Sequence, residues 1–449
     1  MAVRHFNTYR ERRRRLGTNL GKRGIIFVPG AKTTLRNADT EYPFRQESNF
    51  FYLTGFTEPN ALLVVTGGKK PQSVIFCDPR NRGREIWTGK CFGPEGAKRE
   101  FGFHKAVANN DADNSKVLAD IFSNKEVIYY PEHRDVGALF RNTINSCLKN
   151  GEAKRFPLFL DSDRLLGETR LIKEDVEIAT MTRAAMISAV THRKILSVVH
   201  PGMTEVELEA EFTYRFRRAG GDPLHAYPPI VATGQNACTL HHTSTGTRIK
   251  NGELVLVDAG CEYEGYASDI TRTFPANGRF TSEQRVIYEI VLSAQKAAIA
   301  AARAGAQLCA VHNAATLVIC EGLMALGILP SGDPTKILES GAYSQFFPHG
   351  TSHWLGLDVH DAGDYIRWGD GKNRRVLAPG MVITVEPGIY IQPDAQHVEG
   401  KWLGIGVRIE DDVLITPEGN RVFSDRAPKE IAEIEGIMQH AEKCTARNK

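Results

Sequence analysis

The chain has 449 residues, of which 42% are hydrophobic and 24% are charged, as in an ordinary globular protein. Its formal net charge of +3 at pH 7 excludes the strongly basic character that is typical of nucleic-acid-binding proteins. A chain of this length buries enough apolar surface to fold without disulfide or metal cross-links. A bound metal ion would therefore serve chemistry rather than folding.

The first third of the chain alternates short apolar segments with polar and helical ones. We expect buried strands of an α/β sheet at residues 24–29, 62–65, 74–77 and 127–130. The one dense basic run, residues 12–15, is interpreted as a solvated face of an N-terminal helix.

The hydrophobic pattern changes near residue 170. Apolar residues then recur at helical spacing over residues 173–199. Thr204 begins another helix, and Glu207 is placed to complete a capping box. The sequence therefore predicts two domains, residues 1–170 and residues 171–449.

The early chain resembles neither a secretion signal nor a membrane anchor. Its longest apolar stretch, residues 25–28, is far too short for a signal-peptide core or a membrane span. The eight cysteines are scattered and form no Cys-x-x-Cys pair, which is typical of buried, reduced thiols in a cytosolic protein. We therefore predict a cytoplasmic protein that binds neither membranes nor nucleic acid.

The second domain contains a faint internal duplication. Residues 252–260 read GELVLVDAG and residues 380–388 read GMVITVEPG, so an acid follows an apolar run in both. Each run leads into a second acid-bearing strand and follows a pair of expected helices. These helices are expected at residues 173–199, 204–218, 282–303 and 310–326. Two such halves would bring four acids together at their junction: Asp258, Asp269, Glu386 and Glu410.

These acids lie in or beside strongly apolar strands, where an unpaired carboxylate is very unfavourable. Each acid taken alone is more often structural, and Arg408 could pair with Glu410 on the same strand face. The histidines near them in the motifs are His241, His242, His349, His353 and His360. Several acids with one or more histidines favour a two-metal hydrolytic site, in which oxygen-rich ligands prefer Mn²⁺ or a similar ion.

The motifs resemble those of the bacterial aminopeptidase P family. The similarity rests on TGQNACTLHHT, LVLVDAGCEYEGYASDITRTF, HGTSHWLGLDVHD, VEPGIY and GVRIED, and in the first domain on NADTEYPFRQESNFFYLTGFTEP and REIWTGK. It implies an α/β N-terminal domain followed by an α+β pita-bread catalytic domain with an internal pseudo-twofold duplication. It also implies a metallo-aminopeptidase that removes the first residue of peptides with proline second, through a hydroxide activated by two divalent ions, Mn²⁺ being preferred.

The resemblance also assigns the metal ligands, motif by motif. Asp269 and Glu410 would bridge the two ions, and Glu386 would in addition move protons during the reaction. The complete ligand set would be Asp258, Asp269, His353, Glu386 and Glu410.

Further positions match residues that surround the site in the family. His360 and His241 would hold the substrate and stabilise the developing negative charge. His349 and Arg408 would orient the metal ligands, and Tyr365 would line the pocket.

Trp87 matches an N-terminal position that reaches the active site of a neighbouring subunit in the family, which implies a homo-oligomer, either a dimer or a tetramer. Two features depart from the pattern. His242 beside His241 leaves open which imidazole acts, although the Leu-His placement favours His241. The Gly-rich basic loop of residues 367–376 is expected to alter the rim of the site.

Two alternatives remain open. Prolidase shares the fold and the ligands but cleaves only Xaa-Pro dipeptides, so it must clamp the proline carboxylate, normally with a rigid arginine. Arg408 is a conceivable clamp, although its place beside Glu410 favours an orienting role. A non-catalytic binding protein on the same fold is less favoured, because all five ligand positions hold competent residues.

Overall fold

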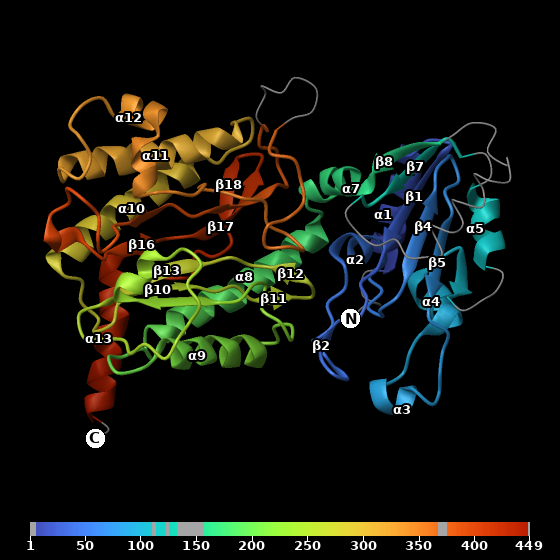
Figure 1. The fold of residues 1–449 in the computed structure, drawn as a ribbon, viewed down its shortest axis with the longest axis horizontal. Helices are drawn as coiled ribbons and strands as arrows, with labels where there is room; N and C mark the ends of the chain where they lie inside the picture. Colours follow the sequence, from blue (N-terminus) through green and yellow to red (C-terminus); the bar gives the residue numbers. More distant parts are fainter. Residues whose placement is uncertain (1–5, 110–113, 123–124, 133–156, 367–374, 448–449) are drawn as a thin grey trace. The chain divides into compact units, whose positions relative to one another are not determined.

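The computed structural model describes residues 6–109, 114–122, 125–132, 157–366 and 375–447. It contains two compact units, Met1–Thr169 and Arg170–Lys449, which are seen as ribbons in Figure 1. Each unit has a hydrophobic core of its own. Both units combine helices and strands, as the α/β and α+β predictions require.

The first unit is built on a six-stranded mixed sheet with the order β6-β5-β4-β1-β7-β8. Its central strand β1 pairs antiparallel with β4 and parallel with β7. The strands of this sheet are β1 (Gly24–Pro29), β4 (Leu62–Thr66), β5 (Ser73–Cys77), β6 (Lys105–Ala108), β7 (Val127–Tyr130) and β8 (Leu158–Asp161). The four strands that the sequence predicts are therefore confirmed.

Short helices and one small hairpin complete the first unit. The helices are α1 (Phe6–Asn19), α2 (Ser48–Thr54), α3 (Glu85–Thr88), α4 (Gly93–Phe101), α5 (Asn114–Phe122) and α7 (Ser162–Leu171), the last of which runs into the second unit. The hairpin consists of β2 (Leu35–Asn37) and β3 (Thr40–Glu41).

Half of the basic run in α1 is buried and is not the solvated face that we expected. Arg12 and Arg13 are only 4% and 2% exposed. Arg12 donates to Tyr52 O at 3.0 Å, and Arg13 donates to Leu53 O at 2.8 Å and Phe101 O at 2.7 Å. These carbonyls lie at the C-terminal ends of α2 and α4, where the helix leaves them unsatisfied and electronegative. The prediction is wrong for Arg12 and Arg13, because their acceptors come from distant segments, whereas Arg14 and Arg15 are exposed as expected.

The second unit consists of small antiparallel sheets between helices. In Figure 1 the pair α10–α11 and the helix α9 lie on opposite sides of the strands. Its first half contains α8 (Asp175–Ile195), α9 (Glu205–Arg218), β9 (Ile230–Thr233), β10 (Leu254–Asp258), β11 (Glu262–Tyr263), β12 (Tyr266–Ala267) and β13 (Thr271–Pro275). The capping box of Thr204 and Glu207 is present at the start of α9.

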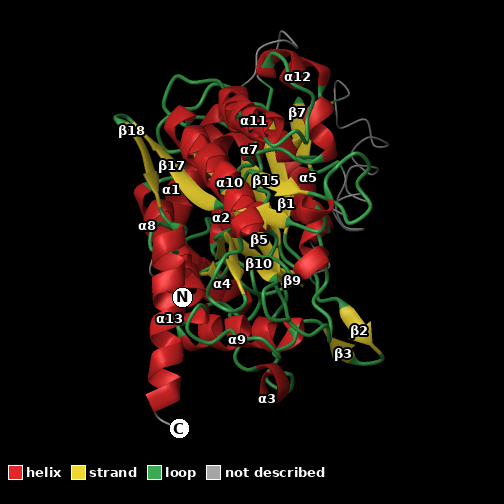
Figure 2. Ribbon diagram, turned by 90° about the vertical axis from the view of Figure 1, so that its left-hand side faces the viewer, coloured by secondary structure: helices red, strands yellow, loops and turns green. Residues whose placement is uncertain are grey.

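The second half repeats the pattern of two helices followed by strands. It contains α10 (Ser282–Ala301), α11 (Leu308–Ala325), α12 (Pro334–Ser340), β14 (Val382–Val385), β15 (Gly388–Tyr390), β16 (Gly406–Arg408), β17 (Asp411–Thr416), β18 (Gly419–Val422) and α13 (Ile431–Arg447). Figure 2 shows α13 extending away from the strands towards the C-terminus.

The two halves place their acids in the same way. β10 ends in Asp258 and pairs antiparallel with β13, which begins two residues after Asp269. In the second half Glu386 directly follows β14, and Glu410 directly precedes its antiparallel partner β17. The halves are joined where Thr271 Oγ1 donates to Glu410 Oε2 at 2.7 Å. The expected duplication is thus present, and all four acids lie at the paired strand ends.

Among the described residues, α11 is the one helix that is long and apolar enough to cross a membrane. Its residues Val311, Ala315, Ile319 and Leu323 are fully buried in the core of the second unit. Because the buried helix of a globular core passes the same test of length and composition, this is weak evidence for a membrane protein.

His192 in α8 is a titratable group enclosed in the core. It is 2% exposed, its Nε2 lies 3.0 Å from Ala259 O, and its ring packs edge-on against Phe212. Its Nδ1 has no hydrogen-bond partner in the structure, so protonation would place an N–H group in the core without an acceptor. Burial accordingly lowers the pKa of His192 to about 4.

We predict that this histidine makes the protein less stable in mild acid. Because its pKa is lower in the folded state than the unfolded value of about 6.5, its full contribution is present above pH 6.5 and is lost as the pH falls to about 4, a change of about 3 kcal/mol. His192→Gln keeps a donor for Ala259 O and does not titrate. Urea unfolding at about pH 7 and about pH 4.5 should show a smaller loss for the variant; equal losses would contradict this prediction.

Candidate active site

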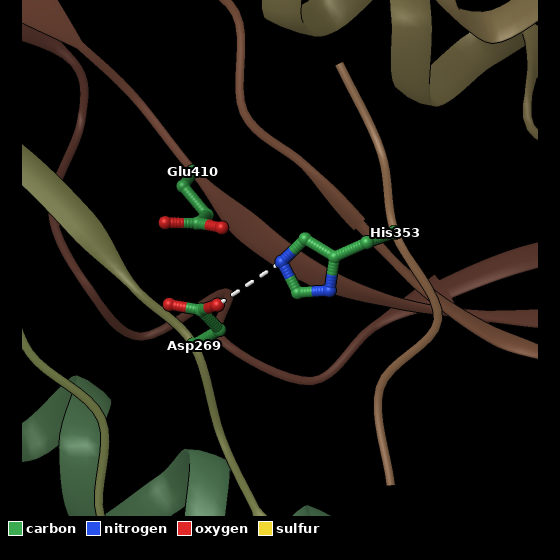
Figure 3. A group of neighbouring side chains, drawn as sticks. All are labelled: Asp269, His353 and Glu410. Carbon is green, nitrogen blue, oxygen red and sulfur yellow. Dashed lines mark ion pairs between the residues drawn. The ribbon is translucent and has the colours of Figure 1, made fainter. Parts of the chain in front are cut away.

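Asp269, His353 and Glu410 come together in the second unit. One ligand atom from each lies within 4.8 Å of the others, and Figure 3 shows both carboxylates and the imidazole facing a common space. His353 Nε2 is 3.3 Å from Asp269 Oδ2. The three side chains are contributed by the segment before β13, the segment beside β14 and the residue before β17.

His353 is held in place by β14. The His353 N–H donates to Thr384 Oγ1 at 3.1 Å, and the Thr384 N–H donates to His353 O at 3.0 Å. Its Nδ1 lies 2.9 Å from Trp354 O. A proton on Nδ1 therefore leaves the lone pair of Nε2 free for a cation. Burial lowers the pKa of His353, but without a cation Asp269 and Glu386 outweigh burial and raise this pKa to about 9.

Asp258 is oriented by two donors. Tyr227 donates from its hydroxyl to Oδ1 at 2.5 Å, and Arg408 donates from Nη2 to Oδ2 at 2.8 Å. Arg408 is 4% exposed and also donates to Tyr390 Oη at 2.9 Å and Thr271 Oγ1 at 3.2 Å. The ion pair of Arg408 is thus with Asp258 in the other half of the unit, and not with Glu410, which lies just beyond the end of β16 and which the sequence had offered as a partner.

Glu386 lies between two imidazoles. Its carboxylate oxygens are 3.5 Å from His353 Nε2 and 3.8 Å from His349 Nδ1. Burial, aided by the charge of Asp269 and opposed by that of His353, raises the pKa of Glu386 to about 7. His349 Nε2 lies 2.8 Å from Tyr390 Oη. Burial and the nearby Arg408 lower the pKa of His349 to about 4, so this ring is neutral at pH 7.

The donor set fits a divalent metal site. Burial and repulsion from Asp258 raise the pKa of Asp269, and burial and repulsion from Asp269 raise the pKa of Glu410. Within the described part of the chain, Arg408 is the one Lys or Arg side chain that forms an ion pair with any of the four acids. Clustered carboxylates with one imidazole nitrogen are suitable ligands for divalent ions, which would relieve this repulsion.

The remaining histidines of the motifs separate into two groups. The rings of His360 and His353 are 4.3 Å apart between centroids. Burial, His353 and His241 together lower the pKa of His360. His242 Nε2 instead lies 2.9 Å from the fully buried carboxylate of Glu205. His242 thus anchors its loop, whereas His241 is exposed and near enough to His360 to lower its pKa.

Two other residues were predicted to line or reach the site: Tyr365 and Trp87. Tyr365 stacks on Trp354 at 5.6 Å, and its hydroxyl accepts from the Trp354 N–H at 3.3 Å. Trp87 belongs to α3 of the first unit and is 87% exposed. Of the basic loop, residues 367–374 lie outside the described residues, while Arg375 Nε donates to Asp364 O at 2.9 Å.

Sequence reasoning missed the two tyrosines that contact the site. Tyr227 binds Asp258, and Tyr390 joins Arg408 to His349. Tyr390 follows Glu386 in the VEPGIY motif and lies on β15, whose partner strand β16 carries Arg408. Tyr390 is an even number of residues from Glu386, which in an extended chain places both side chains on the same face, and this spacing could have indicated its role. Nothing near Tyr227 in the sequence indicates its contact with Asp258.

A duplicated domain with this donor set at its junction defines the class of a metallopeptidase, and the comparisons with known proteins agree. The sequence profile described as "Metallopeptidase family M24" matches residues 179–417, and that of "Aminopeptidase P, N-terminal domain" matches residues 9–129. The chain belongs to metallopeptidase family M24, and the expected fold class and family are confirmed.

Its relatives are named for one activity. The chain is 40% identical to Xaa-Pro aminopeptidase of Escherichia coli strain K12 over 94% of this chain and 95% of the relative. It is 41% identical to the Haemophilus influenzae enzyme of that name over 96% of both. Among solved structures, Pseudomonas aeruginosa aminopeptidase PepP superposes with a TM-score of 0.93 at 41% identity, covering 99% of this chain and 100% of the other. A variant Escherichia coli aminopeptidase P in complex with substrate gives 0.91 at 38%, covering 98% and 99%.

Proposed function

We propose that this chain is an Xaa-Pro aminopeptidase, which hydrolyses the bond between the first residue of a peptide and a proline at the second position. The observation that carries the proposal is the cluster of Asp269, His353 and Glu410, flanked by Asp258 and Glu386, in a chain whose relatives along nearly its whole length carry that name. An Xaa-Pro bond is a tertiary amide without an N–H group. This bond therefore cannot donate a hydrogen bond to an enzyme. A site that binds the free amine and the carbonyl of the substrate does not need such a donor.

The five predicted ligands would hold two divalent ions, for which we propose Mn²⁺. When bound, such ions activate a water molecule and polarise the scissile carbonyl. Glu386 is placed to take a proton on its carboxylate and to deliver it to the proline nitrogen, which leaves as a secondary amine. His360 and His241 contact the substrate from the exposed side of the cluster and stabilise the negative charge on its oxygen.

The contacts of Arg408 favour an aminopeptidase over prolidase. A prolidase must bind the carboxylate of its dipeptide, and a buried, rigid arginine suits that purpose. Here Nε, Nη1 and Nη2 of Arg408 already donate to Thr271, Tyr390 and Asp258. This guanidinium is therefore committed to orienting a metal ligand and does not serve as the carboxylate clamp that a prolidase needs.

We predict faster cleavage of Xaa-Pro-Yaa tripeptides than of Xaa-Pro dipeptides, with release of Xaa from both. The measurement compares kcat/KM for two such peptides that share the same first residue. A preference for the dipeptide by more than about tenfold would assign the chain to prolidase. Binding of both peptides without hydrolysis by the metal-loaded protein would instead support a non-catalytic role.

We further propose a cytoplasmic homo-oligomer, a dimer or tetramer, in which residues 1–170 form the N-terminal domain and residues 171–449 the catalytic domain. The exposed Trp87 and Ile86 of α3 support an intersubunit contact. The six described cysteines are free thiols, and burial raises the pKa of Cys77, Cys238 and Cys261 to about 12. Unpaired, protonated thiols are typical of a reducing compartment.

A further inference from the structure

A buried ion cluster lies directly beside His360. The carboxylate of Asp361 accepts from Arg170 Nη2 and, at 2.9 Å, from Lys173 Nζ. The side chains of Asp361, Arg170 and Lys173 are 1%, 2% and 1% exposed. Arg170 Nη2 also donates to Asp358 Oδ2 at 2.9 Å. These charges gather at the start of the second unit, where α7 ends and α8 begins.

The cluster fixes the loop that joins the two histidines of the site. Between His353 and His360 the chain closes on itself, because the Asp361 N–H donates to Trp354 O at 2.9 Å. The Asp361 carboxylate packs so closely on Gly356 that a Cβ there would lie 2.2 Å from Oδ2. Arg170, by bridging Asp358 and Asp361, clamps the same loop from outside. The loop closed in this way joins His353 to His360, whose rings lie 4.3 Å apart.

Stability alone is a poor reason for such a cluster. Removing charges from water is costly, and well-packed apolar residues often serve as well or better than a buried ion pair. Directional hydrogen bonds, in contrast, fix a loop in one conformation more strictly than apolar packing does. The cluster adjoins His360 in sequence, and through Gly356 O, which accepts from the Ala267 N–H at 2.8 Å, its loop is also tied to the segment before Asp269.

We propose that Arg170, Lys173 and Asp361 are positioning residues for His360, which hold its imidazole at the distance from His353 that turnover requires. The proposal rests on the proposed function. It assigns a role in the reaction to the segment with which the second unit begins. None of the three side chains is assigned contact with substrate or metal, and their proposed effect on turnover is exerted through His360.

The test is a double-mutant cycle between Arg170→Met and His360→Ala, measured as kcat on an Xaa-Pro-Yaa tripeptide. Each single variant should lose at least about tenfold in kcat, within the range that general acid–base and electrostatic groups contribute. In the His360→Ala background, Arg170→Met should change kcat by less than about twofold, because the group that it positions is absent. Independent losses that multiply would overturn the proposal.

Three controls separate positioning from general damage. Ile319→Ala, a core truncation in α11, should lower the denaturation midpoint while leaving kcat unchanged. Arg170→Lys keeps the charge but presents fewer donors, so its loss in kcat should lie between those of the parent and Arg170→Met. This variant replaces Arg170→Met in the cycle if Arg170→Met does not fold. Mn²⁺ content of each variant should equal that of the parent, and loss of metal would overturn the proposal by showing that the cluster acts on His353. A parent protein without tripeptide turnover would refute the proposed function instead.

Discussion

The Glu386→Gln variant is expected to fold normally and to lose at least ~10²-fold in kcat, since general acid–base catalysis alone contributes 10²–10⁴-fold. Glutamine keeps the size of the side chain and an oxygen that faces His353 and His349. It removes one negative charge from the metal ligands and the group that carries a proton to the leaving nitrogen. Steady-state kinetics on an Xaa-Pro-Yaa peptide, with Mn²⁺ in excess, measures the effect on kcat apart from metal loss.

Glu321→Gln is a matched control for this prediction, because Glu321 is an exposed residue of α11. It should retain the kcat of the parent. A Glu386→Gln variant within tenfold of the parent would show that another group moves the proton. His349, whose Nδ1 lies 3.8 Å from the Glu386 carboxylate, would then be the first residue to test.

Removal of metal is expected to abolish activity and leave the fold intact. The second unit has its own large hydrophobic core, so its folding does not depend on cross-links. The acids would remain close together in the metal-free protein, where burial raises the pKa of both Glu386 and Glu410 and so favours their neutral forms. After exhaustive chelation, far-UV circular dichroism should be unchanged while turnover is lost.

Returning Mn²⁺ should restore activity in the chelated protein, and metal analysis should approach two ions per chain. Loss of the circular dichroism signal on chelation would show that the ions hold the fold together, as in small zinc domains. Saturation at one ion per chain would contradict the two-ion site and leave Asp258 without a metal to bind.

Local patterns allowed much of the fold to be predicted from the sequence. The strand at residues 24–29 and the capping box of Thr204 and Glu207 depend on neighbours in the chain, and both are present. The helix expected over residues 173–199 instead ends at Ile195. Beyond Ile195 the N–H groups of Ser197 and Val198 bond to the carbonyls three residues earlier, so the chain continues in tight turns instead of an α-helix.

Contacts between distant segments explain what could not be predicted. Arg13 is buried because carbonyls about 40 and 88 residues away accept its hydrogen bonds, and a charge pattern carries no trace of them. Arg408 ends β16 and Glu410 lies outside it, and the partner of Arg408 is Asp258, 150 residues earlier. The four acids and the one imidazole predicted as ligands were proposed from their motifs, while the contact of Tyr227 with Asp258 required the three-dimensional structure.

The hydrogen bond between Thr271 and Glu410, which joins the two halves of the second unit, also bears on the stage of folding at which the site forms. It joins residues 139 positions apart, and closing so long a loop is entropically costly and slow. The metal ligands therefore assemble only after both halves have folded and nearly the whole chain has left the ribosome. A nascent chain that ends before Glu410 has half of the acids at most in their final places. Metal capture thus marks the completion of folding rather than its beginning.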